Sequence, residues 1–363
     1  MSFSGSYRRG EVTFLLKPLP LQGFVDVAEK ERLIQSGQRH YSEMLSPERA
    51  PSARYMQVFH DACAANNARM ARDCLRLAAL VAARRTAGVT VVSLARAGTP
   101  VGVVVARLLA EVFARPAPHF SVSIVRDRGI DQAALRHILA RGHAAESIVF
   151  VDGWTGKGVI ARELAASVAA FNSLHGTSID SGLYVLSDLA GAAACAASSE
   201  DYLIPSSILN ATVSGLVSRT VLNEAIGPED FHGCVYYENL AGHDQSQSFA
   251  DELVRLAREF AGEHDYAAAA AADASRSAVV SRSFIEAALR RYAVADVNLI
   301  KPGIGEATRV LLRRVPRLLL LRDAEAPEVA HLRLLAEEKH VPVEVNPALP
   351  YHAVSLIRST SDG

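Results

Sequence analysis

The sequence predicts an α/β protein in which a parallel sheet covered by helices is followed by a second, smaller α/β domain. Three observations carry this prediction. Apolar runs of strand length alternate with helical segments from residue 88 onward, the pattern of a parallel sheet covered on both faces. Several of these runs end in polar or glycine-rich loops, and ligands of such sheets sit at the carboxyl ends of the strands. The alternation resumes near residue 297, beyond an alanine-rich stretch at 267–272.

The composition is that of a soluble globular protein. The 363 residues are 50% apolar and 21% charged with a formal charge of −1, so no overall charge attracts nucleic acid or a membrane. Cys63, Cys74, Cys195 and Cys234 are scattered without CxxC spacing, which indicates reduced thiols and a cytoplasmic location. The N-terminus is polar and no apolar stretch reaches membrane-spanning length, so we expect neither a signal peptide nor a membrane partner.

The first predicted elements are a long helix and a strand, and the strand ends in a glycine loop at 95–102. Residues 1–55 are interrupted by prolines and predict loops with short elements, whereas 54–83 has the apolar spacing of a helix. A strand at 89–94 ends in the first glycine loop. The helix after this loop is expected to begin with Thr99 as its N-cap and Pro100 at its first position.

Three further strands end in polar residues. We expect these strands at 121–125, 147–151 and 183–187. The helix after the first of them is expected to be capped by Asp131 and ended by Gly142. The last strand ends on Asp188, which favours a contact to base or metal and a turn cap about equally.

A change in composition separates two domains. We place the first domain at 1–265, with its core at about 55–225, a linker at 266–280, and the second domain at 281–363. Segment 191–223, rich in small residues, is expected to form a hood over the site. The elements expected in the second domain are 297–300, 305–314, 317–321, 327–339 and 343–345.

The stretch from Asp152 to Gly158, Asp-Gly-Trp-Thr-Gly-Lys-Gly, carries most of the functional prediction. Glycines after a buried strand let backbone N–H groups approach an anion, and the following helix adds partial positive charge. A cation such as Lys157 is unfavourable at a helix start unless an anion is near, which favours phosphate over an ordinary tight turn. Asp152 can hold a ribose hydroxyl or Mg²⁺.

A second glycine loop strengthens the prediction of phosphate binding. Residues 95–102 offer backbone amides and Arg96 at the end of another strand. A ligand with two phosphate groups on a sugar, such as phosphoribosyl pyrophosphate, would use both loops. We therefore expect the two loops to face one another across one cleft.

At these motifs the chain resembles the type I phosphoribosyltransferases. Residues 149–152 followed by 155–158 are similar to that family's strand, acid and phosphate loop, although Gly153 stands where a second acid is usual. The resemblance implies a type I phosphoribosyltransferase-like domain that transfers phosphoribose to or from a base or small acceptor, with Mg²⁺ as its cofactor. The catalytic residues that it implies are Asp152, which also holds the metal, Arg126 and Arg128. The substrate-binding residues that it implies are Arg96, Ala97, Gly98, Thr99, Thr155, Gly156, Lys157, Gly158 and Asp188.

Over nearly its full length the chain resembles a narrower bacterial group. These are the phosphoribosyltransferase-like proteins encoded beside tellurite-resistance and stress-response genes, also named StiP; segments 152–158 and 202–207 carry the resemblance. The second domain of the group is Pelota-like. Residues 303–309 are similar to kink-turn RNA binders, with Gly305 in place of their Asn. The RNA-binding residues that this implies are Glu306, Thr308 and Arg309.

Two alternatives stay open. Some naming of the group includes a cysteine protease, whose thiolate would need a histidine within hydrogen-bond reach. His60 lies three residues before Cys63, and His232 lies two before Cys234, although a free cysteine is more often a small buried hydrophobe. The other alternative is a non-catalytic sensor that binds a nucleotide and RNA. We expect a small-molecule partner, RNA as a second partner, and a homo-oligomer.

Overall fold

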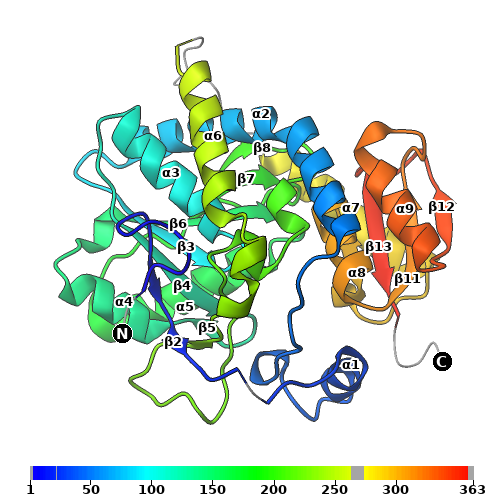
Figure 1. Cartoon of the computed structure of the whole chain (residues 1–363), viewed down its shortest axis with the longest axis horizontal. Helices are drawn as coiled ribbons and strands as arrows, with labels where there is room; N and C mark the ends of the chain where they lie inside the picture. The colour runs from blue at the N-terminus through cyan, green and yellow to red at the C-terminus, as the bar shows by residue number, and fades with distance from the viewer. Residues whose placement is uncertain (1–2, 22, 263–273, 359–363) are drawn as a thin grey trace.

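A largely parallel sheet forms the centre of the first domain (Figure 1). The computed structural model describes residues 3–21, 23–262 and 274–358. The strands of this sheet are β1 (Thr13–Leu15), β3 (Thr90–Ala95), β4 (His119–Val125), β5 (Gly129–Ile130), β6 (Ile148–Thr155), β7 (Leu183–Asp188) and β8 (Cys195–Ser198). They run in the order β1-β4-β3-β6-β7-β8 with every neighbouring pair parallel, and β5 pairs antiparallel with β4. The predicted α/β class with a parallel sheet is confirmed.

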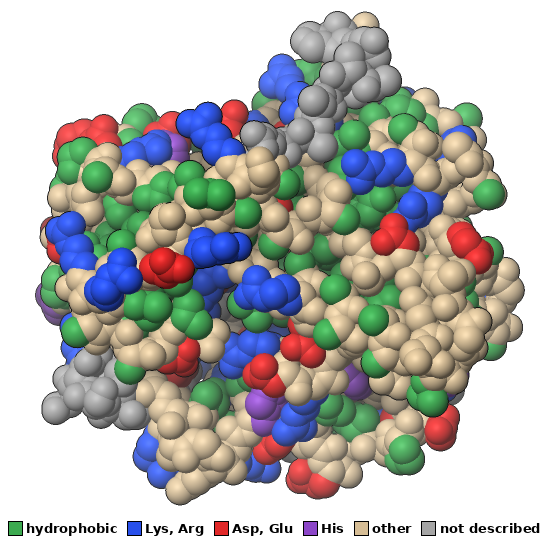
Figure 2. Space-filling view, turned by 180° about the vertical axis from the view of Figure 1, so that it is seen from behind, with side chains coloured by type: hydrophobic (Ala, Val, Ile, Leu, Met, Phe, Trp, Pro, Cys, Tyr) green, Lys and Arg blue, Asp and Glu red, His purple; other side chains and the backbone are tan. Residues whose placement is uncertain are grey.

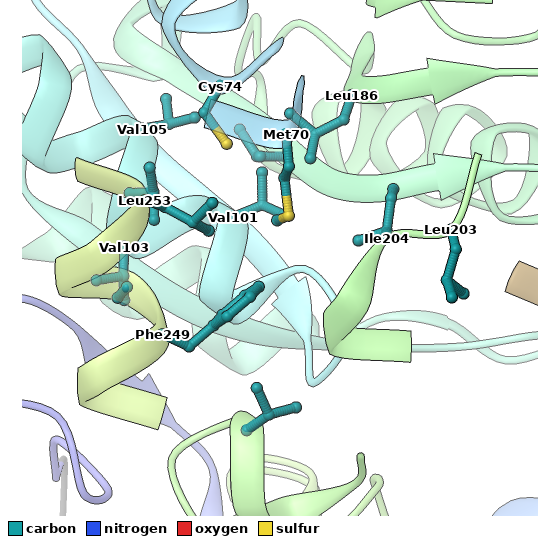
Figure 3. Close-up of a cluster of buried hydrophobic side chains, with 14 of the residues drawn as sticks. Met70, Cys74, Val101, Val103, Val105, Leu186, Leu203, Ile204, Phe249 and Leu253 are labelled. Carbon is teal, nitrogen blue, oxygen red and sulfur yellow. The ribbon is translucent and has the colours of Figure 1, made fainter. Parts of the chain in front are cut away.

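Helices cover both faces of this sheet. One face carries α2 (Ala53–Arg84), α3 (Thr99–Glu111) and α6 (Ser246–Phe260), and the other carries α4 (Gln132–Ala140) and α5 (Val159–His175). Successive residues of a strand point to opposite faces, so Val91 packs with the first group and Val92 with the second. Figure 3 shows the first layer, where Met70, Val101 and Leu253 lie together. Among the described helices, none combines the length and the apolar character of a membrane span.

The helix starts follow the predicted caps in one case and depart from them in another. Asp131 caps α4 as predicted, because its carboxylate accepts from the Ala134 N–H at 3.0 Å. The N-cap of α3 is Gly98, and the Thr99 hydroxyl lies 2.7 Å from the Ser121 hydroxyl instead. The predicted Thr99 cap is therefore wrong, since the adjacent buried strand gives this hydroxyl another partner.

The segment before α2 contains the short elements that the sequence predicts, and three of them, β1, β2 and α1, have defined places. β1 completes one edge of the central sheet, and β2 (Lys17–Pro18) pairs in parallel with β9 (Gly233–Cys234). α1 (Val27–Gln35) lies beside the second domain, where Glu31 pairs with Arg314 at 2.6 Å. The short 3₁₀ turns among the described residues are η1 (Tyr41–Glu43), η2 (Ala145–Ser147), η3 (Pro205–Ser207), η4 (Ala211–Val213), η5 (Glu238–His243), η7 (Val297–Leu299) and η8 (Pro327–Val329).

A second, smaller domain follows, as predicted. Its elements are α7 (Ala274–Arg291), β10 (Ile300–Pro302), α8 (Ile304–Arg313), β11 (Pro316–Leu321), α9 (Ala330–Glu338), β12 (Val343–Val345) and β13 (Ala353–Ile357). The sheet order is β10-β13-β11-β12, and β13, which the sequence did not predict, is antiparallel to both neighbours. Of the predicted linker, residues 266–273 lie outside the described residues, and 274–280 already belong to α7.

The two domains are joined by buried backbone contacts. One carboxylate, that of Asp201, accepts the N–H of Ile304 and the N–H of His352, each at 2.8 Å. Gly303, in the left-handed region with φ of 93°, packs so closely that a Cβ atom would lie 2.6 Å from the Leu189 side chain. Because Asp201 holds both the start of α8 and the residue before β13, a single residue of the first domain contributes strongly to the orientation of the second.

Candidate functional site

The candidate site lies where the carboxyl ends of the central strands meet the second domain. Figure 2 shows Lys and Arg side chains gathered around a hollow in the middle of one face, between the second domain and the sheet domain. The strands β3, β4, β6 and β7 are parallel, so the loops that follow them all begin at this edge of the sheet. The predicted polar loops are therefore brought to one edge of the sheet.

The glycine turn of the 152–158 motif is shorter than the sequence predicts. β6 continues to Thr155, so only three residues form the turn into α5. The Thr155 hydroxyl accepts the Gly158 N–H at 2.9 Å and closes the turn. On the side of the turn that faces the second domain, a Cβ atom at Gly156 would lie 3.1 Å from the Pro302 carbonyl oxygen. The turn is thus covered by the second domain rather than open to solvent.

Lys157 extends from this turn to the second domain. Its Nζ donates to the Val297 carbonyl at 2.6 Å, so a residue of the second domain is its hydrogen-bond partner. Burial first and the neighbouring Lys301 second lower the pKa of Lys157 to about 7. A lysine with such a pKa is poorly stabilised by the protein alone.

Asp152 lies beside an ion pair of the second domain. Its carboxylate accepts the Gly153 N–H at 2.8 Å, and burial raises its pKa to about 6, an effect that Arg309 opposes. Arg309 pairs with Glu306 at 3.2 Å and stacks over the Trp154 ring at 4.4 Å. Acid, base and aromatic groups from both domains therefore share this part of the cleft.

The loop at the end of β3 does not present its arginine to a ligand. The Arg96 guanidinium pairs with Glu48 at 2.5 Å and donates to Asn210 at 2.9 Å and to the Val217 carbonyl at 3.0 Å. Asn210 and Val217 belong to segment 191–223, the predicted hood. A Cβ atom at Gly98 would lie 2.7 Å from the Val151 carbonyl oxygen, so this loop packs on the neighbouring strand. Protein groups therefore already bind Arg96 and cover Gly98, which were expected to hold pyrophosphate. Ala97 lies between Arg96 and Gly98 in the same loop.

The remaining predicted residues of the first domain bind protein groups. Tyr41 accepts the Arg126 N–H at 2.8 Å, and the Arg126 guanidinium lies 5.5 Å from the centre of that ring. Arg128 pairs with Glu43. The carboxylate of Asp188 accepts two backbone N–H groups, of Ala190 at 2.9 Å and of Ala193 at 2.8 Å. Asp188 is thus a turn cap, one of the two roles that the sequence left open.

The residues expected to read RNA face the first domain. Glu306 and Arg309 form the ion pair against Trp154, and each side chain is less than one-third exposed. The Thr308 hydroxyl is buried and donates to the Ile304 carbonyl at 2.8 Å. A Cβ atom at Gly305 would lie 3.3 Å from Trp154, so this helix start is in close contact with the other domain.

The described residues around Asp152 offer few ligands for a metal ion. No group of three or more His, Cys, Asp and Glu residues comes together anywhere in residues 3–21, 23–262 and 274–358. Next to Asp152 stands a carboxylate, Glu306, whose partner is already Arg309. The donor set therefore fits Mg²⁺ poorly unless a ligand of its own accompanies the ion.

The four cysteines differ in exposure. Cys74, Cys195 and Cys234 are buried, whereas Cys63 on α2 is half-buried. Burial raises the pKa of the Cys63 thiol to about 12, opposed by a side-chain hydrogen bond with Asn67.

The histidine nearest to Cys234 in sequence has another partner. The Nδ1 atom of His232 lies 2.7 Å from the Ser123 hydroxyl, and its backbone N–H donates to Asp131 at 2.6 Å. Burial raises the pKa of Cys234 to about 12. This pair therefore does not form an activated thiol.

Fold and site together define a two-domain α/β protein with a basic hollow between its domains and one accessible thiol. A family model described as "Tellurite-like stress resistance cysteine protease StiP" matches residues 5–254, and the PELOTA RNA binding domain matches residues 279–359. Cysteine protease StiP of Acinetobacter baylyi is 40% identical over 373 residues, which cover 99% of this chain and 96% of the relative. The chain belongs to the StiP family.

These comparisons confirm the predicted resemblance to StiP and the Pelota-like second domain, and they correct the predicted function. The main prediction, a phosphoribosyltransferase that uses phosphoribosyl pyrophosphate, is wrong, because both the family and the relative are described as cysteine proteases. A strand, glycine turn and helix occur in many unrelated enzymes, so this unit alone does not define the reaction. The alternative based on cysteine chemistry is the one that the comparisons favour.

Proposed function

We propose that this chain is a thiol-dependent peptidase with Cys63 as its nucleophile. The description of its family and the name of its relative support a cysteine peptidase. One observation supports the choice of residue: Cys63 is half-buried, whereas the other three cysteines are buried. A peptide carbonyl can be attacked only by a sulfur atom that it can reach.

His60 is the general base in this proposal. It is exposed on α2, three residues before Cys63, and residues three apart on a helix have Cβ atoms about 5–6 Å apart. A thiol pKa of about 12 means that Cys63 is protonated at neutral pH, so a base must take its proton during attack. Asn67 lies one turn further along the same face, and its side chain opposes the rise in the thiol pKa.

The reaction proceeds through a thioester. His60 accepts the Cys63 proton as the sulfur attacks the peptide carbonyl carbon. The C–N bond then breaks, and the amine leaves with the proton that His60 returns. Water, deprotonated by His60, attacks the thioester carbonyl, which releases the carboxylic acid and restores the thiol.

Hydrolysis of fluorescein-labelled casein by the full chain tests this proposal. We expect Cys63→Ala to abolish hydrolysis and His60→Ala to lower it about 100-fold or more, the usual contribution of a general base. Cys195→Ala, at a buried thiol, is the matched control and should retain activity. Mass spectrometry after iodoacetamide treatment should find Cys63 modified before the other cysteines.

Two outcomes would overturn the assignment. Unchanged hydrolysis by Cys63→Ala would exclude this residue as the nucleophile. A wild-type chain that neither cleaves casein nor is alkylated at Cys63 would exclude the peptidase mechanism at this position.

RNA is the partner that we propose for the second domain, on the support of the PELOTA match to residues 279–359. Binding of a structured RNA in a mobility-shift titration should weaken as salt is raised, because phosphate contacts release counterions. No shift at low salt would contradict this partner. A small-molecule substrate, a homo-oligomer, a cytoplasmic location, Mg²⁺ at Asp152 and a type I phosphoribosyltransferase-like topology stay predictions from the sequence.

A further inference from the structure

Six cationic side chains converge on the hollow from segments that are far apart in sequence. Two come from the second domain, two from loops at the carboxyl edge of the central sheet, one from α1 and one from the hood segment. They are Lys30, Arg126, Lys157, Arg219, Lys301 and Arg314. The hollow shares no residue with the proposed peptidase site.

Side-chain contacts place these cations around one space. Arg126 and Arg219 lie over the same Tyr41 ring, at 5.5 and 5.7 Å from its centre. Arg126 also lies 3.4 Å from the Asn298 side-chain oxygen, one residue from the Val297 carbonyl that binds Lys157.

The second half of the cluster is joined in the same way. Arg314 pairs with Glu31, the residue next to Lys30. A Cβ atom at Gly156, the residue before Lys157, would touch Pro302, the residue after Lys301. The cations therefore form a continuous lining rather than separate surface charges.

The protein provides too few anions for this lining. Within the described part of the chain, Lys30, Lys157, Arg219 and Lys301 have no carboxylate within 4.0 Å. Of the other two cations, Arg314 pairs with Glu31 at 2.6 Å and Arg126 with Asp127 at 3.1 Å. The buried Nη1 atom of Arg219 has no hydrogen-bond partner among the described residues.

Burial and mutual repulsion act in the same direction on these groups. Burial is the largest cause in each case and neighbouring cations add to it, so the pKa of Lys30 falls to about 8 and that of Arg219 to about 10. The pKa of Lys301 is lowered as well, by burial first; Glu306 opposes this effect, and Arg314 and Arg126 add to it. Half-buried cations without counter-ions are unfavourable unless a ligand supplies the negative charge.

We infer that the hollow binds a compact polyanion that carries two or more phosphate groups. Four unpaired cations match the charge of a pyrophosphate or of a nucleoside triphosphate, and both guanidinium and ammonium groups bind phosphate oxygens well. The recessed position favours a small ligand, since Arg126 and Arg314 expose only 31% and 35% of their side chains. Because the cations come from both domains, the ligand would hold the domains together.

Calorimetric titration of the full chain with pyrophosphate and, separately, with ATP tests this inference. We expect binding of at least one of them, weakened tenfold or more by Lys157→Met and by Lys301→Met. Lys339→Met, at an exposed lysine after α9, is the matched control and should bind like the wild type. Tighter binding of ATP would identify a nucleotide as the ligand, and tighter binding of pyrophosphate would identify a free polyphosphate.

Thermal unfolding separates a ligand site from a structural role. Without ligand, Lys301→Met should unfold at the same or a higher temperature than the wild type, because it removes a repelled charge. Pyrophosphate should raise the unfolding temperature of the wild type and of Lys339→Met but not that of Lys301→Met. The inference is overturned if neither anion binds at millimolar concentration, if sulfate at matched ionic strength acts as strongly, or if Lys301→Met binds normally.

Discussion

At the scale of single residues, Asp152 shows how the cleft sets an ionisation state. Its carboxylate has one backbone donor, and burial outweighs the attraction of Arg309, so its pKa rises from 3.8 to about 6. A carboxyl with a raised pKa adds stability below its unfolded pKa, and this stability is lost as pH rises through the folded value. For Asp152 that loss falls between about pH 4 and pH 6. At neutral pH the buried, ionised carboxylate therefore lowers the free energy of unfolding.

The Asp152→Asn variant should remove this cost. Asparagine keeps an oxygen that can accept the Gly153 N–H but carries no charge to bury. We expect the variant to be more stable than the wild type by about 1 to 3 kcal/mol at pH 7.5, and equally stable near pH 4. Urea unfolding at the two pH values measures the difference. A gain of the same size at both values would show that ionisation is not its cause.

At the scale of elements, the start of α5 depends on a glycine. Gly158 is in the left-handed region with φ of 70°, and a Cβ atom there would clash with the Ala192 side chain. Gly158→Ala should therefore destabilise the protein by about 2 to 4 kcal/mol, from backbone strain and overpacking together. Gly142, with φ of 88° and nothing within 4 Å, is the matched control.

Gly142→Ala should lower the free energy of unfolding by about 1 to 2 kcal/mol, from backbone strain alone. Urea unfolding of both variants measures the two costs on one scale. Equal losses would mean that the contact with Ala192 relaxes freely and that the turn is not tightly packed.

The sequence predicted the central strands because they are buried on both faces and read as continuous apolar runs. It did not predict β8, whose residues Cys-Ala-Ala-Ser include no β-branched or aromatic side chain. The position of the glycine turn at 156–158 was also predictable, but the second domain that covers this turn was not. Lys157 meets Val297, 140 residues away, and Arg96 meets Asn210, 114 residues away. Local patterns carry no information about such partners, so the sequence alone predicts an open phosphate loop here.

At the scale of the whole molecule, the second domain completes the cleft of the first. It contributes Lys301 and Arg314 to the basic lining and places Glu306 beside Asp152. Four of the six cations, Lys30, Arg219, Lys301 and Arg314, could not be predicted from the sequence, because α1, the hood and the second domain contribute them as isolated residues. The orientation of the domains therefore determines whether the hollow exists.

Asp201 is the residue whose removal tests this dependence. Its carboxylate holds the N–H groups of Ile304 and His352, and each such hydrogen bond to a charged group contributes about 1.5 to 3 kcal/mol. Asp201→Ala should separate unfolding into two transitions and weaken pyrophosphate binding, whereas Asp201→Asn, which can accept one of the two bonds, should lie between. Calorimetric unfolding and pyrophosphate titration on the same samples measure both effects. A single transition at the wild-type temperature, together with unchanged binding, would mean that the domains are held by other contacts and that the hollow does not depend on Asp201.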